Sequence, residues 1–295
     1  MQSGKRIAFI GLGKMGVPMA GNLLKAGFAV AGFDLSEAAR SALKDAGGVA
    51  AASVAEAFAG ADYIITMLPN GKIVQDALTR GDVYKLAPKG SILLEMSSSA
   101  PAQTRALAEQ VSGYLRVVDA PVSGGVKRAV DGTLAIMVGG SEADYRDALP
   151  VLDVMAAKLF FCGPVGAGHA MKAINNYVSG AGVTAAAEAV LLGEAFGLEA
   201  GTVVDVLNAS SGKNNATEVK MKQFVLSGTF ASGFAMGLMA KDIRTAADLS
   251  ASLGLDQPGL RQTAKLWDDA VTAIGDSADH TRFYEYLARQ GARRE

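Results

Sequence analysis

A lysine and an asparagine stand in an otherwise small and apolar stretch of the chain, GPVGAGHAMKAINNYVSGAG, at residues 163–182. Lys172 and Asn176 are four residues apart, so a helix would place the ammonium group and the carboxamide on one face, one turn apart. An ammonium group can exchange a proton with a substrate, and a carboxamide can bind a substrate without adding charge. The alternative is that both side chains only reach solvent or cap the helix.

A glycine-rich turn follows the first apolar run of the chain. Gly11, Gly13 and Gly16 form the pattern GxGxxG between that run and a helical stretch, and Asp34 ends the next apolar run. In a dinucleotide site such glycines allow a tight turn and a close approach of the pyrophosphate, and the acid binds the ribose hydroxyls. A turn that serves packing alone is the alternative. The residues predicted to bind the cofactor here are Gly11, Leu12, Gly13, Lys14, Met15, Gly16 and Asp34.

Asp34 also bears on the choice of cofactor. Its carboxylate would repel a 2′-phosphate, and the next residues, Leu35 and Ser36, supply no arginine that would bind one. The sequence therefore favours NAD over NADP.

Two further apolar runs end in residues that could contact the same cofactor. Leu68 and Pro69 end one run, and Ser97 follows another. Nucleotides bind outside the carboxyl ends of the strands in doubly wound sheets, so we predict cofactor contacts at all three residues. Ordinary loop positions are the alternative.

A serine and two glycines follow a later apolar run, in the segment DAPVSGGVKRAVDGTLAIMVGG at residues 119–140. Adjacent glycines can turn their N–H groups toward one point, and the serine hydroxyl adds another donor. Ser123, Gly124 and Gly125 could thus bind a carboxylate, although a plain turn is an equally simple interpretation.

The elements that must position these residues follow from the pattern of apolar runs. Between Lys5 and Cys162, β-rich runs alternate with helical stretches, which is typical of a parallel sheet covered by helices. After Gly168 only helical patterns follow. We therefore predict an α/β fold with an N-terminal Rossmann domain, residues 1–163, and an all-α C-terminal domain, residues 164–295, joined by a long helix that carries Lys172. The predicted strands cover residues 6–10, 29–33, 63–68, 91–96, 115–119, 134–138 and 158–161, and three of the predicted helices cover residues 14–26, 101–111 and 142–154.

Composition narrows the class of partner. The 295-residue chain has 28 basic and 29 acidic residues and a net charge of −1, which gives no electrostatic footprint for nucleic acid or an anionic membrane. We expect a small-molecule substrate. Cys162 is the only cysteine, which excludes an internal disulfide or a multi-cysteine metal site and fits a reducing cytoplasm.

Four motifs in the same order resemble the β-hydroxyacid dehydrogenases, a family that includes 3-hydroxyisobutyrate dehydrogenase and tartronate semialdehyde reductase. The motifs are GLGKMGVPMAGNLLKAG at the start, DAPVSGG in the middle, GAGHAMKAINN around Lys172, and KDI at residues 241–243. The resemblance implies that Ser123, Gly124 and Gly125 bind the substrate carboxylate, that Asn176 also binds substrate and that Lys172 is catalytic. It further implies that Lys241 lies near the nicotinamide, and it predicts a homodimer or homotetramer.

The sequence thus predicts an NAD-dependent oxidoreductase that interconverts a small β-hydroxy acid and its semialdehyde, with Lys172 as general acid and base. This chemistry requires no metal. An NADPH-dependent reductase of aldehyde acids such as glyoxylate or succinic semialdehyde is one alternative, and Asp34 argues against it. A dinucleotide-binding sensor without turnover is another, and Lys172 and the DAPVSGG turn argue against that.

Overall fold

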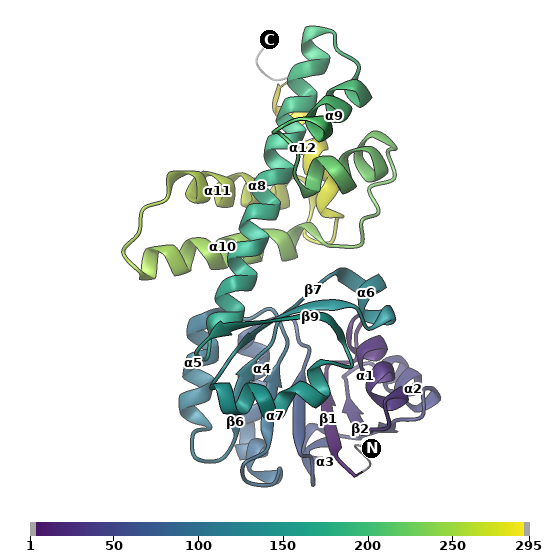
Figure 1. The fold of residues 1–295 in the computed structure, drawn as a ribbon, viewed down its shortest axis with the longest axis vertical. Coiled ribbons are helices and arrows are strands. Elements are labelled where there is room, and N and C mark those ends of the chain that lie inside the picture. The colour runs from purple at the N-terminus through teal and green to yellow at the C-terminus, as the bar shows by residue number, and fades with distance from the viewer. Residues whose placement is uncertain (1–3, 292–295) are drawn as a thin grey trace. The chain divides into compact units, whose positions relative to one another are not determined.

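The apolar runs in the first part of the chain pair into one nine-stranded sheet (Figure 1). The computed structural model describes residues 4–291. The strands are β1 (Arg6–Ile10), β2 (Ala29–Phe33), β3 (Val49–Ala50), β4 (Tyr63–Thr66), β5 (Ile92–Glu95), β6 (Arg116–Asp119), β7 (Val122–Ser123), β8 (Leu134–Gly139) and β9 (Ala156–Gly163). The elements between them are α1 (Gly16–Lys25), α2 (Glu37–Asp45), α3 (Val54–Phe58), α4 (Gly71–Thr79), the 3₁₀ segment η1 (Arg80–Leu86), α5 (Pro101–Gln110), α6 (Gly125–Asp131) and α7 (Glu142–Leu152).

The strand order β3-β2-β1-β4-β5-β6-β8-β7, with β9 beside β8, has the central reversal of a Rossmann sheet. The sequence predicted a parallel sheet covered by helices, and the sheet is parallel over most of its strands but antiparallel near one end. Pairing is parallel from β3 to β6, but β8 runs antiparallel to both β6 and β7. A parallel connection needs a crossover, usually through a helix. Here β7 continues in the direction of β6, and the chain reverses through α6, so β8 pairs antiparallel with both strands.

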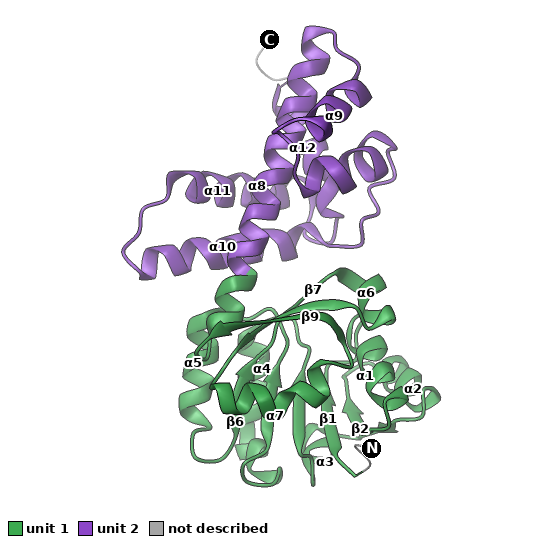
Figure 2. Ribbon diagram, viewed as in Figure 1, with its two compact units in different colours: residues 1–172 green, residues 173–295 purple. Residues whose placement is uncertain are grey.

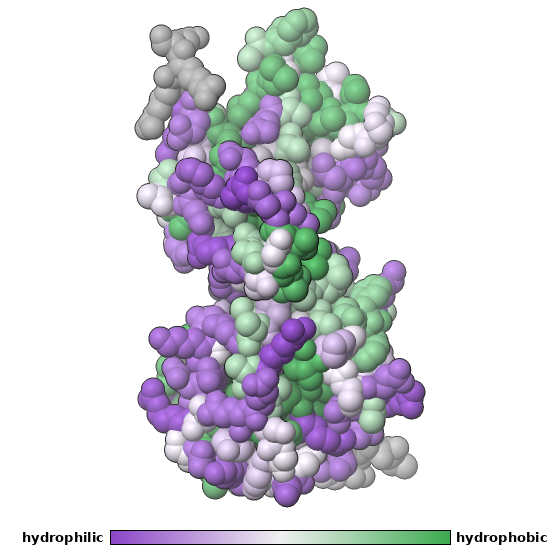
Figure 3. Space-filling view, turned by 90° about the vertical axis from the view of Figure 1, so that its left-hand side faces the viewer, coloured by the Kyte–Doolittle hydropathy of each residue, from purple (hydrophilic) through white to green (hydrophobic). Residues whose placement is uncertain are grey.

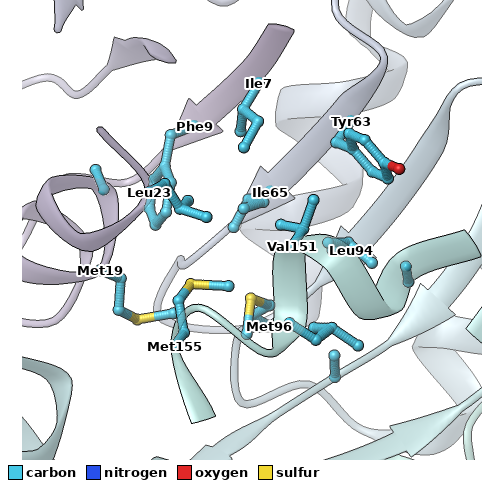
Figure 4. Packing of buried hydrophobic residues seen from close by; sticks show 14 of the residues in the cluster. Ile7, Phe9, Met19, Leu23, Tyr63, Ile65, Leu94, Met96, Val151 and Met155 are labelled. Carbon is cyan, nitrogen blue, oxygen red and sulfur yellow. The ribbon is translucent and has the colours of Figure 1, made fainter. Parts of the chain in front are cut away.

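Both faces of the central strands β1, β4 and β5 are buried, because alternate residues of these strands enter different cores. Ile7 and Phe9 of β1 pack with Leu23 of α1 and Val151 of α7 (Figure 4). Ala8 and Ile10 belong to the cluster on the other face, with side chains from α3, α4 and α5. This two-sided burial explains why the strands are continuous apolar runs.

A second, helical unit begins at Ala173, and the first ends at Lys172, so the division falls inside α8 (Figure 2). The core of the second unit is built around Trp267, which is fully buried. The indole ring stacks on Phe283 with 4.3 Å between ring centroids, and its N–H donates a hydrogen bond to Thr184 Oγ1 (3.2 Å). The elements are α8 (Ala167–Phe196), α9 (Ala200–Ala209), the π-helix η2 (Ala216–Leu226), α10 (Met236–Ser252), α11 (Pro258–Ile274), η3 (His280–Arg282) and α12 (Phe283–Gly291). The domain boundary at residue 163 stays a prediction.

Each predicted strand and helix named above is present, with ends that differ by a few residues. The first helix begins at Gly16 rather than near Lys14, and the two-residue strands β3 and β7 were missed, so that Ser123 lies in a strand rather than after one. Cys162, the single cysteine, is half-buried in β9. Within residues 4–291, none of the helices combines the length and the apolar character needed to span a bilayer.

Candidate functional site

The glycine turn after β1 is shaped by close backbone contacts. Gly11 has φ of +98°, and a Cβ on it would collide with the carbonyl of Met67. A Cβ on Gly16 would collide with Gly11 O, whereas a Cβ on Gly13 would meet nothing within 4 Å. Packing therefore requires glycine at the first and third positions, and the open space at Gly13 lets a ligand approach the backbone. These residues fit a pyrophosphate.

Asp34 is fixed beside this turn. Its Oδ2 accepts a hydrogen bond from the Leu12 amide (2.7 Å), and its Oδ1 accepts one from the Ser36 amide (2.8 Å). Each carboxylate oxygen has a further lone pair, so the group can still accept hydrogen bonds from the two ribose hydroxyls. Arg40 was missed in the sequence because it lies in α2, yet its guanidinium donates to the backbone carbonyl of Asp34 (2.5 Å).

The residues predicted at the ends of β4 and β5 meet in the structure. Ser97 is buried, and its hydroxyl accepts a hydrogen bond from the Leu68 amide (2.9 Å). Pro69 follows Leu68 in the loop before α4. Ser97 therefore joins the ends of two adjacent strands, while its predicted contact with a cofactor remains a prediction.

A buried ionic cluster, which we define as Glu95, Asp119 and His169, lies beside Ser97. His169 Nε2 is 3.0 Å from Glu95 Oε2, and its Nδ1 is 2.9 Å from Thr104 Oγ1. The same Nε2 is 3.0 Å from the carbonyl oxygen of Ser97 and makes its hydrogen bond there. Glu95 Oε2 has no hydrogen-bond partner within residues 4–291, so Glu95 interacts with the imidazole ring through its charge. This cluster was not predicted, since Glu95 and Asp119 lie in apolar strands and no local pattern indicates that they meet His169.

The charges in this cluster stabilise one another. Burial disfavours ionisation of Glu95, but the attraction of His169 and the hydrogen bond from the Ser97 amide to Glu95 Oε1 (3.0 Å) oppose burial, and the pKa of Glu95 lies below its usual value. Burial likewise disfavours the imidazolium form of His169, but the two carboxylates outweigh it, and the pKa of His169 lies above its usual value. Glu95 and His169 therefore form a buried ion pair within the first unit.

Asp119 also holds the beginning of α8. Its two carboxylate oxygens accept hydrogen bonds from the amides of Gly166 (2.7 Å) and His169 (2.8 Å). A carboxylate at a helix N-terminus satisfies amides that have no partner within the helix and interacts favourably with the helix dipole. The first turn of α8, which leads to Lys172, is thus anchored to the end of β6.

The predicted catalytic lysine and the predicted anion turn meet within the first unit. Lys172 is half-buried, and its Nζ donates a hydrogen bond to the carbonyl of Val122 (2.9 Å), the residue before Ser123. Gly124 and Gly125 follow with φ of +136° and +70°, values that favour glycine and turn the backbone sharply after β7. An ammonium group, a serine and two glycine amides are therefore neighbours along one short strand and its turn.

Asn176 and Lys241 belong to the second unit and are linked through Asp242. The Asn176 amide donates to Asp242 Oδ2 (2.5 Å), and Lys241 Nζ lies 3.2 Å from Asp242 Oδ1. Both Asn176 and Asp242 are buried. Asp242 was not singled out in the sequence, although it stands inside the KDI motif.

Comparisons with known proteins identify the class. A family model described as the NAD binding domain of 6-phosphogluconate dehydrogenase matches residues 6–163. A second model, described as NAD-binding of NADP-dependent 3-hydroxyisobutyrate dehydrogenase, matches residues 166–287. With the Rossmann strand order and the glycine turn, these matches define an NAD-dependent oxidoreductase of hydroxy acids.

The chain belongs to the β-hydroxyacid dehydrogenase family. It is 42% identical to an NAD-dependent L-serine dehydrogenase of Pseudomonas aeruginosa, over 97% of this chain and 93% of that protein. It is also 42% identical to a 2-(hydroxymethyl)glutarate dehydrogenase of Eubacterium barkeri, over 84% of this chain and 83% of that protein. A structure of 3-hydroxyisobutyrate dehydrogenase from Mycobacterium tuberculosis with L-serine superposes with a TM-score of 0.89 at 37% identity, covering 96% of this chain and 99% of that one. The predicted family, fold class, NAD cofactor and small-molecule substrate are confirmed.

Asp34 is expected to set the preference for NAD. Asp34→Asn should raise the ratio of kcat/KM with NADP to kcat/KM with NAD about 10- to 100-fold, because the repulsion of a 2′-phosphate is removed and Arg40 is close enough to attract one. The double variant Asp34→Asn/Arg40→Ala is the control and should lose most of the gain. Wild-type enzyme that uses NADP as well as NAD would contradict the role of Asp34.

Proposed function

We propose that this enzyme oxidises the primary alcohol of a 2-substituted 3-hydroxypropanoate to the semialdehyde, and that Lys172 transfers the hydroxyl proton. The observation that supports this proposal is the hydrogen bond from Lys172 Nζ to Val122 O, which holds the ammonium group beside Ser123. A substrate whose carboxylate binds Ser123 and the amides of Gly124 and Gly125 would carry its hydroxyl group near this nitrogen.

The substrate class follows from the names of the relatives. L-serine, 2-(hydroxymethyl)glutarate and 3-hydroxyisobutyrate share one arrangement, a hydroxymethyl group and a carboxylate on the same carbon. They differ only in the third substituent of that carbon. We therefore propose that this shared part is what Ser123, Gly124, Gly125 and Lys172 recognise.

The proton transfer needs Lys172 in two forms. In oxidation the neutral amine accepts the hydroxyl proton as the C–H bond breaks and the C=O bond forms, and in reduction the ammonium group returns that proton. NAD, bound by the glycine turn and Asp34, supplies the hydride acceptor for this chemistry. The carbonyl of Val122 orients Lys172 Nζ in both oxidation and reduction. Asn176 can bind the substrate without adding charge.

A panel of primary hydroxy acids tests the proposed function. The wild-type enzyme is assayed with 3-hydroxyisobutyrate, L-serine, 2-(hydroxymethyl)glutarate and D-glycerate, with NAD and NADP in parallel. Turnover of at least one acid that carries a hydroxymethyl group beside the carboxylate supports the proposal. Turnover of semialdehydes with NADPH alone favours the reductase alternative, and binding of NAD without any turnover favours the sensor.

Ser123 is expected to bind the carboxylate. Ser123→Ala should raise KM for the hydroxy acid about 10- to 100-fold, since a hydrogen bond to a charged group contributes roughly 1.5 to 3 kcal/mol. The amides of Gly124 and Gly125 remain, so kcat should change less than KM. Ser252→Ala, at an exposed serine of α10, is the matched control. An unchanged KM in Ser123→Ala would show that the carboxylate binds elsewhere.

We also propose that the enzyme acts as a homodimer or homotetramer in the cytoplasm, without nucleic-acid or membrane partners. Large apolar side chains are exposed near the end of α8, with relative accessibilities of 73% for Leu192, 83% for Phe196 and 51% for Leu198. Figure 3 shows apolar surface gathered over that end of the second unit. A second copy of the chain would cover it. Light scattering of the purified protein measures the mass and tests this point.

A further inference from the structure

The carboxylate of Asp119 joins the two segments that bring Lys172 to the predicted anion turn. Asp119 ends β6, and Val122, whose carbonyl accepts the hydrogen bond from Lys172 Nζ (2.9 Å), follows three residues later in β7. The amides of Gly166 and His169, which this carboxylate binds, lie around the first residue of α8, the helix that carries the lysine. All of these residues belong to the first unit, which ends at Lys172.

The carboxylate holds the beginning of α8 at two points. The two amides are three residues apart and bind different oxygens of Asp119, at 2.7 and 2.8 Å, so the helix can neither rotate about its axis nor slide along it without breaking one of these bonds. Asp119 is fully buried, with 0% relative exposure, so water cannot replace it as the acceptor. Such support from a rigid sheet is what keeps a catalytic side chain in its productive position.

Two glycines let the helix approach the sheet closely enough for this attachment. A Cβ on Gly168 would lie 2.5 Å from Met137 O, and a Cβ on Gly139 would lie 2.4 Å from Asp119 Oδ1. Neither contact is possible without a shift of the backbone or of the carboxylate, so both positions require glycine. The close packing of α8 against β6 and β8 therefore leaves its first turn little freedom of position.

We propose that Asp119 is a positioning residue for Lys172: its carboxylate keeps the ammonium group at Val122 O, beside Ser123, and it affects turnover only through the lysine. The inference rests on the proposed function, because it assumes that Lys172 transfers the proton. Asp119 is buried, so it acts without contact with the substrate. A displacement of about 1 Å can lower a rate about 100-fold, so a small shift of the first turn is sufficient for a large effect.

A double-mutant cycle on kcat tests this inference. Asp119→Asn keeps the size of the side chain but offers one carboxamide oxygen in place of two carboxylate oxygens, so one of the two amides loses its acceptor. Lys172→Ala, Asp119→Asn and the double variant are compared with the wild type, with NAD and the hydroxy acid that the wild type oxidises fastest. Urea unfolding of each variant gives its stability, and titration with NAD gives its affinity for the dinucleotide.

We expect Asp119→Asn to lower kcat about 10- to 100-fold in the wild-type background. In the Lys172→Ala background the same substitution should change kcat less than about threefold, because a residue that acts through the lysine has no further effect once the lysine is removed. KM for the acid and Kd for NAD should change less than kcat, since Ser123 and the glycine turn are intact.

Glu95→Gln is the matched control. It removes a second buried carboxylate of the same sheet, but this carboxylate interacts with the side chain of His169, at 3.0 Å, rather than with the backbone of α8. Glu95→Gln should therefore lower the free energy of unfolding while kcat stays within about threefold of the wild type.

Gly168→Ala tests the same attachment without removing the carboxylate. The added methyl group would collide with Met137 O and push the beginning of α8 away from the sheet. This variant should also lower kcat in the wild-type background and have little further effect in the Lys172→Ala background.

Three results would overturn the inference and leave the proposed function standing. The first is a folded Asp119→Asn variant with wild-type kcat. The second is an equal fall of kcat in both backgrounds, which would mean that Asp119 does not act through Lys172. The third is failure of both Asp119→Asn and Gly168→Ala to fold, which would make the attachment a requirement of stability alone. If Lys172→Ala keeps wild-type kcat, or the wild type oxidises none of the acids, the proposed function fails and this inference fails with it.

Discussion

Lys172→Ala is expected to lower kcat about 10²- to 10⁴-fold, the usual effect of removing a positioned general acid or base. Affinity for NAD should change little, because the residues that fit the dinucleotide lie in the turn after β1 and at Asp34. Stability should also change little, since the side chain is half-buried and its recorded hydrogen bond, to Val122 O, joins it to a short strand. Steady-state kinetics, titration with NAD and thermal unfolding measure the three quantities.

Lys172→Arg separates proton transfer from electrostatic binding. The guanidinium keeps the positive charge but does not give up its proton at accessible pH, so a purely electrostatic role would survive and a general-base role would not. The pH profile of kcat/KM for oxidation should rise through an apparent pKa in the wild type, and this rise should be absent in the arginine variant. An arginine variant with near-normal turnover and an unchanged profile would make Lys172 a substrate anchor only.

His169→Ala is expected to lower the free energy of unfolding by about 3 to 5 kcal/mol, because it leaves Glu95 buried without its cation. Both side chains of this pair are nearly inaccessible, at 0% and 1% relative exposure, and 3.0 Å separates their charged atoms. Arg146→Ala is the matched control, since it removes the cation of an ion pair whose side chains are 71% and 70% exposed. That control should lose less than about 1 kcal/mol.

Urea unfolding of both variants measures this difference, with the m-value as a check that unfolding stays two-state. A loss in His169→Ala no larger than in the Arg146 control would mean that Glu95 is protonated in the native protein.

The pH dependence of the free energy of unfolding of the wild type is a second test of the ion pair between Glu95 and His169. The pKa of His169 is raised in the folded state. Its contribution to stability is therefore complete below the pKa of the unfolded state, 6.5, and is lost as the pH rises through the pKa of the folded state. Because the pKa of Glu95 is lowered, its contribution is complete above 4.5 and is lost as pH falls through the folded value. The pair therefore stabilises the protein fully between about pH 4.5 and 6.5.

The sequence alone was sufficient for the parts of this protein that depend on local pattern. Strands buried on both faces must be continuous apolar runs, so β1 and β4 could be located from the amino-acid sequence. The glycine turn could be assigned because Gly11 adopts a φ of +98° and a Cβ on Gly16 would collide with Gly11 O, so both positions require glycine. The spacing of Lys172 and Asn176 likewise predicted one helix face.

Tertiary structure decided everything that depends on pairing between distant segments. The strand β7 exists only because it pairs with β8, and the direction of that pairing is not encoded in hydrophobicity. His169 and Ser97 are 72 residues apart and Lys220 and Ser179 are 41 apart, yet each pair is joined by a hydrogen bond. A charged residue in a sequence shows neither its burial nor its counter-ion. Whether Glu95 is neutralised depends on folding, because only packing removes water and sets which charges meet.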